Sequence, residues 1–82
     1  MDKEFNEKFD VLLEKYTELM VGETNSDLKD KIEKWALYTY ISKSMPPLIK
    51  HWNHQYPEAK QEMIELIKEI KSLNEQLRES KS

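Results

Sequence analysis

The stretch that decides the fold is Trp35-Ala-Leu-Tyr-Thr-Tyr-Ile-Ser-Lys-Ser-Met-Pro-Pro-Leu-Ile-Lys-His-Trp-Asn-His-Gln-Tyr56. It holds both tryptophans, three of the four tyrosines and both histidines of the 82-residue chain. Proline removes a backbone donor and pushes the residue before it out of the α region, so Pro46 and Pro47 must end a preceding helix near Ser44. Pro47 then opens a short helix that reaches Tyr56.

Two segments before the Pro-Pro break have the apolar period of packed helices. Between Asp2 and Val21 apolar residues recur in alternating steps of four and three, and Gly22 follows where a left-handed cap is expected. Capping residues near Asn25 or Ser26 predict the start of a second helix. The latter half of this second helix is apolar nearly all round, so it must be covered from two directions.

Downstream, Pro57 opens a third long helix that reaches about Glu79, and residues 79–82 are expected to be frayed. Composition agrees, because 35% of the residues are charged and only one is glycine. We predict that residues 1–82 form a single all-α domain: a small antiparallel helical bundle of three long helices, plus one short helix after the Pro-Pro break. The predicted core comprises Phe5, Phe9, Leu12, Tyr16, Leu28, Ile32, Trp35, Trp52, Met63, Ile67 and Ile70.

Charge and hydropathy exclude several classes of function. The chain has 16 acidic and 13 basic side chains, with no cluster of lysines and arginines, so we expect no nucleic-acid partner. Its longest nearly apolar run, about residues 35–41, is far shorter than the roughly 20 residues that span a bilayer. The N-terminus lacks the basic and apolar regions of a signal peptide, and there is no cysteine. The sequence therefore predicts a cytoplasmic protein with no membrane association.

No catalytic or metal-binding motif stands out. His51 and His54 share the short helix, but zinc sites use three or four ligands and no carboxylate cluster accompanies them. Ser42 and Ser44 lack the glycine-rich turn and the oriented histidine that a serine nucleophile needs. We therefore expect a protein that is not an enzyme and holds no metal or other cofactor.

The apolar second face of the middle helix is the candidate functional surface. A ten-residue helix covers only part of this face, which favours a homodimer; a short helix that covers it completely would instead leave a monomer. We expect a non-enzymatic protein that acts by protein–protein interaction or self-association, with an unidentified protein partner also open. The alternative is a ligand- or peptide-binding module that uses the aromatic segment 35–56. The candidate contact residues are Leu37, Tyr38, Ile41, Met45, Trp52 and Tyr56.

Two stretches of the chain resemble a known family. Leu12-Leu-Glu-Lys-Tyr-Thr-Glu-Leu-Met-Val-Gly-Glu-Thr24 and Ile41-Ser-Lys-Ser-Met-Pro-Pro-Leu-Ile-Lys-His-Trp-Asn53 are similar to a family of short uncharacterised proteins from Bacillus and related bacteria. The likeness covers most of the chain and implies a cytoplasmic bacterial protein. Since that family carries no established activity, the resemblance implies no site residue and no mechanism.

Overall fold

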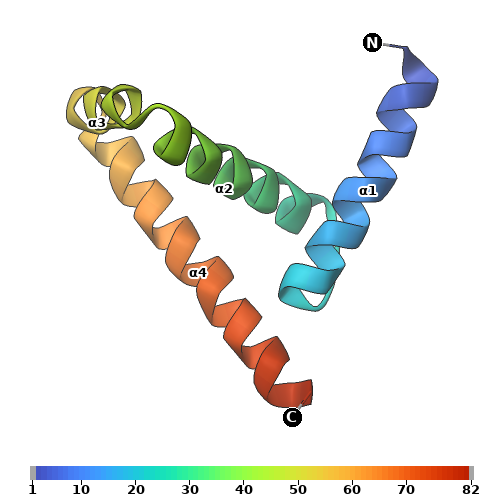
Figure 1. Cartoon of the computed structure of the whole chain (residues 1–82). Coiled ribbons are helices and arrows are strands. Elements are labelled where there is room, and N and C mark those ends of the chain that lie inside the picture. Colours follow the sequence, from blue (N-terminus) through green and yellow to red (C-terminus); the bar gives the residue numbers. More distant parts are fainter. Residues whose placement is uncertain (1, 82) are drawn as a thin grey trace.

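The computed structural model describes residues 2–81, which form four helices (Figure 1). They are α1 (Lys3–Val21), α2 (Ser26–Ser44), α3 (Pro46–Gln55) and α4 (Pro57–Lys81). This range contains no strand, and the predicted all-α fold of three long helices and one short helix after the Pro-Pro break is confirmed. Helix α4 includes residues 79–81 of the segment expected to be frayed, while Ser82 lies outside the described residues.

Local capping explains where the helices begin and end. The Asp2 carboxylate accepts a hydrogen bond from the Phe5 amide at 2.8 Å, and the Asn25 side chain accepts one from the Leu28 amide at 2.8 Å. Gly22 ends α1 with φ of 92°, the left-handed conformation that glycine adopts without a steric penalty. Helix α3 begins at Pro46, one residue earlier than predicted, because a first-turn proline loses no intrahelical hydrogen bond.

The core lies where the second half of α1 meets the first half of α2 and the middle of α4. Its buried apolar cluster consists of Val21, Leu28, Ile32 and Ile70. Around it pack the half-buried side chains of Leu13, Met20, Trp35, Leu66 and Leu73. Thr17, with no exposed surface, satisfies its hydroxyl by donating to the Leu13 carbonyl at 2.7 Å. Four predicted core residues are confirmed as buried, namely Leu28, Ile32, Met63 and Ile70.

The part of the core prediction that concerns α1 is wrong. Phe5, Phe9, Leu12 and Tyr16 are all exposed, although they carry the heptad-like period of the helix. At 100° per residue the centre of this group lies about 95° around α1 from the centre of the group that faces the core, which consists of Leu13, Thr17, Met20 and Val21. The other predicted core residues, Trp35, Trp52 and Ile67, are half-buried. Helix α1 therefore has two apolar faces, and the fold of a single chain covers one.

The four helices form an open arrangement. In Figure 1, α2 and α4 diverge from the corner made by α3, and the first half of α1 extends away from the other helices. The radius of gyration is 14.6 Å, against about 12 Å for a compact chain of this length. The accessible surface of 6622 Å² exceeds by about 1,400 Å² the value typical of a compact 9.9 kDa monomer.

The four helices differ in length, from 10 residues in α3 to 25 in α4. Among residues 2–81, we find no helix that combines the length and the apolar character needed to span a lipid bilayer.

Candidate interaction surface

The six contact residues proposed from the sequence divide into two groups. Tyr38, Ile41 and Trp52 are half-buried, whereas Leu37, Met45 and Tyr56 are exposed. The rings of Tyr38 and Trp52 make an edge-to-face contact, with their centroids 6.0 Å apart. The Tyr38 hydroxyl also donates to the Asn53 side-chain oxygen at 3.0 Å. Helix α3 thus packs back on the second apolar face of α2 and covers its centre.

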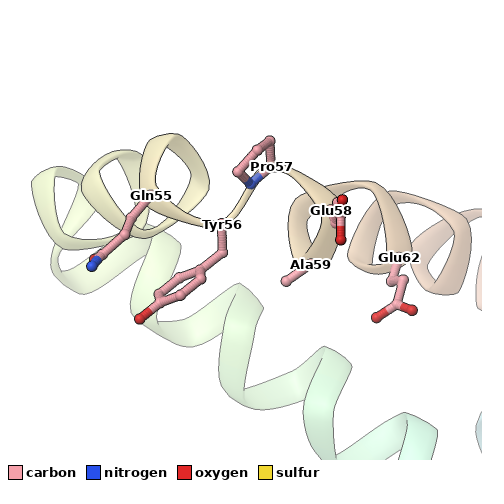
Figure 2. Close-up of a pocket in the computed structure, with 6 residues that line it drawn as sticks. All are labelled: Gln55, Tyr56, Pro57, Glu58, Ala59 and Glu62. Carbon is pink, nitrogen blue, oxygen red and sulfur yellow. The ribbon is translucent and has the colours of Figure 1, made fainter.

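A hollow lies where α3 passes into α4, beside this aromatic contact (Figure 2). The Tyr56 ring points toward α2 on one side of it, and carboxylates from the first turns of α4 lie on the other. Its volume is about 470 Å³, but every lining residue except Ala59 is exposed. A small-molecule site normally encloses most of its ligand behind apolar walls, so this hollow offers a shallow contact at most. It is lined by Gln55, Tyr56, Pro57, Glu58, Ala59 and Glu62.

Both histidines of the short helix are exposed. His54 shares a surface hollow with Lys50 and Lys60, so a metal cation there would face two ammonium groups. Within residues 2–81 we find no group of three or more histidine, cysteine, aspartate or glutamate side chains that could hold a metal ion. The expectation that the protein binds no metal stays a prediction.

Exposed apolar side chains are concentrated on α1. Of the eleven exposed large apolar side chains among the described residues, six belong to this helix, and five of those six follow one line along it. The Phe5 and Phe9 rings stack with centroids 6.1 Å apart, so the line is continuous over its first two turns. We call this line the α1 stripe; it consists of Phe5, Phe9, Leu12, Tyr16 and Leu19.

The α1 stripe has a hollow at its middle. Phe9, Leu12, Leu13 and Tyr16 surround a space of about 240 Å³. These four residues stand at positions i, i+3, i+4 and i+7 of the helix, the spacing that places side chains around one point of a helix surface. The hollow is therefore a small apolar depression within the α1 stripe.

The sequence did not predict the α1 stripe as a surface, because its period assigned Phe5, Phe9, Leu12 and Tyr16 to the core. In the structure Leu13, Met20 and Thr17 form the separate face that contacts the core. The available signal was the width of the apolar sector. A span of about 200° around one helix exceeds what a single neighbouring layer covers.

Polar contacts fix α1, from Asp10 onward, to the rest of the chain. Lys29 of α2 reaches the carboxylates of Asp10 at 2.9 Å and Glu14 at 3.2 Å, and its side chain is only 19% exposed. The hydrogen bond to Asp10 raises the pKa of Lys29, outweighing the burial that lowers it, and the bond to Glu14 adds to the rise. The Asn74 side-chain amide donates to the Met20 carbonyl at 2.7 Å and so ties α4 to the end of α1.

One ion pair joins α2 to α4, and a second within α2 shares its lysine. Lys31 Nζ lies 3.0 Å from a Glu69 carboxylate oxygen and 3.2 Å from one of Asp27. The hydrogen bond to Glu69, followed by that to Asp27, raises the pKa of Lys31. These contacts all involve residues from Asp10 onward, and none of them reaches the first two turns of α1.

Comparison with known proteins identifies the family. Residues 3–80 match the family described as "Protein of unknown function (DUF2573)". The chain is also 59% identical over 75 residues to "Uncharacterized protein YusU" of Bacillus subtilis (strain 168), an alignment that covers 92% of this chain and 79% of that protein. No solved structure matches. The chain belongs to this family, as the resemblance of its two stretches implied, and neither description names an activity.

Proposed function

We propose that this protein is a non-enzymatic helical interaction protein that works as a homodimer. The observation that carries the proposal is the surplus of accessible surface, about 1,400 Å² above that of a compact monomer of 9.9 kDa. A stable protein–protein interface of ordinary size removes about 800 Å² from each partner. A dimer interface would therefore remove much of this surplus.

The first half of α1 supports the same proposal. Every residue from Asp2 to Leu12 is exposed, so this segment buries little apolar area, although Asp10 pairs with Lys29 of α2. Isolated helices shorter than about 12–15 residues are only marginally stable in water. The Asp2 cap and the Lys8–Glu4 ion pair contribute a little, but an exposed ion pair is worth at most about 1 kcal/mol. Contact with a partner would supply the missing stabilisation.

The non-enzymatic part of the proposal is supported by the chemistry of the interior. Thr17 is the one buried polar residue among those described, and its hydroxyl is already bonded to the Leu13 carbonyl. Burial is the usual means of shifting the pKa of a catalytic acid or base. We also propose a cytoplasmic location, which the cysteine-free composition supports.

Sedimentation of the full chain at micromolar concentration tests the proposal. We expect a species of twice 9.9 kDa that dissociates on dilution. A species of 9.9 kDa at all concentrations would contradict it. In that event, a small molecule found on the monomer by native mass spectrometry would favour the alternative, a binding module that uses segment 35–56.

A further inference from the structure

We propose that the α1 stripe is the dimer interface and that its occupant is the α1 stripe of a second copy of this chain. This inference rests on the proposed homodimer and locates it. The sequence placed the contact on the second face of α2, but α3 already covers the centre of that face through Tyr38 and Trp52. On α1, by contrast, all five residues of the stripe are exposed.

The spacing of the α1 stripe is that of a helix-pairing seam. From Phe5 to Leu19 the steps are four, three, four and three, a mean of 3.5 residues, which keeps apolar side chains facing one partner helix. A stripe of this kind is complementary to a copy of itself, because one seam presents both the projecting side chains and the gaps between them. A contact between two such stripes uses the same patch on both copies, as twofold symmetric dimers require.

The hollow in the α1 stripe has the form of a hole that accepts one side chain of a facing helix. In paired helices each projecting side chain enters a hole made by four residues of the facing helix. Phe9, Leu12, Leu13 and Tyr16 make a hole of this kind, of about 240 Å³, at the centre of the stripe. Leu12 is also the middle residue of the stripe, so it lies beside its counterpart in a parallel symmetric dimer, and in an antiparallel one when the two stripes overlap along their whole length.

The α1 stripe contains no charged residue, and the charges on the rest of α1 argue against a membrane as its binding partner. The ion pairs Lys8–Glu4 and Lys15–Glu18 lie on the third face of the helix, outside the stripe. Residues 1–22 carry six acidic and three basic side chains. A helix that lies on an anionic lipid surface instead carries lysines and arginines on its polar face.

Leu12 and Val11 provide a matched pair for the test. The two residues are adjacent, apolar and equally exposed, at 62% and 63%, but only Leu12 belongs to the α1 stripe. Leu12→Glu places a charge from each copy at the centre of the proposed interface. It should raise the dimer dissociation constant at least about 30-fold, the factor of a hot-spot substitution, whereas Val11→Glu should leave the constant unchanged. Both variants should fold, because neither position is buried.

The constant is measured by sedimentation equilibrium of the full chain, with helicity checked by circular dichroism. If the unaltered chain is dimeric and Leu12→Glu leaves its constant unchanged, the α1 interface is wrong while the homodimer stands. Loss of the dimer in Leu37→Glu, an exposed position on α2, would then place the contact there. If the unaltered chain is a monomer, both proposals fail.

Cross-linking gives a second readout that does not depend on disrupting the dimer. The chain has no cysteine, so a single introduced thiol has no competitor. A disulfide requires the two Cα atoms to lie within about 7 Å. Under mild oxidation Leu12→Cys should form covalent dimers and Val11→Cys should not. Cross-linking of neither variant, or of both equally, would overturn the proposed interface.

Discussion

Helices α1 and α4 carry the same alternation of apolar residues, but a single chain covers only that of α4. In α4 the steps of three and four join Met63, Leu66, Ile70, Leu73 and Leu77, all of which are buried or half-buried. In α1 the equivalent residues are all exposed. The comparison teaches that an apolar period indicates that a helix face will be covered, without indicating which chain covers it.

The connections of the two helices explain the difference. The α3 corner turns the chain back, and Ile70 in the middle of α4 packs with Leu28 and Ile32 near the start of α2. Helix α1 is joined to α2 by the short segment of residues 22–25, and its second half alone contacts the core. The face of α1 that meets the core is the one with Thr17, which leaves the α1 stripe outside.

The largest expected effect comes from truncating the covered stripe. Ile70→Ala should lower the free energy of unfolding by about 2–5 kcal/mol, because the cavity forms in a closed core. Leu12→Ala, in solution dilute enough for the monomer to prevail, should change it by less than about 0.5 kcal/mol. Urea denaturation measures both. Equal losses of unfolding free energy in the two variants would show that the apolar residues of α4 are no more buried than those of the α1 stripe.

A smaller effect is expected at the turn that ends α1 beside α4. Gly22→Ala should cost about 1–2 kcal/mol, because alanine is strained at a φ of 92°. The added Cβ would also lie 3.3 Å from Leu77 Cδ1. Thermal unfolding, with the exposed neighbour Glu23→Ala as a control, checks this. If both variants unfold at the same temperature, the left-handed turn does not matter for the placing of α1.

The contact between α4 and the end of α1 should contribute less. Asn74→Ala removes the donor to the Met20 carbonyl and should cost about 0.5–1.5 kcal/mol, the usual net value of one hydrogen bond. Gln76→Ala, at an exposed position two residues away, is the matched control. Chemical denaturation distinguishes them, and a larger loss in the control would contradict the role of Asn74.

The smallest effect is the pH dependence of the tie between α1 and α2. Since the folded state raises the pKa of Lys29, its contribution to stability is complete below the unfolded value of about 10.4 and declines as the pH rises through the folded value. The stability difference between the unaltered chain and Lys29→Met should therefore be smaller at about pH 11 than at pH 7. Denaturation midpoints at the two pH values test this, and a constant difference would contradict it.

The amino-acid pattern was enough to predict the secondary structure and the buried apolar residues of α2 and α4. Asn25, Gly22 and the Pro-Pro break set helix boundaries through hydrogen bonds and backbone conformations that involve a few neighbouring residues. The assignments of Leu28, Ile32 and Ile70 to the core followed from period alone. The expectation that the latter half of α2 is covered from a second side also agrees with the packing of α3 on Tyr38. These features are local, or follow from a single helix face.

Which apolar face of α1 lies inside depends on the packing of the helices against one another. The sequence offered two faces, one with Phe9 and Leu12 and the other with Leu13 and Thr17. The first is more apolar and was the natural choice. The observed packing instead buries Thr17, whose hydroxyl is satisfied within its own helix, and pairs Asp10 with Lys29. Contacts between residues distant in the sequence settle that choice, because burial free energy depends on the shape and reach of the neighbouring helices as well as on the period of one.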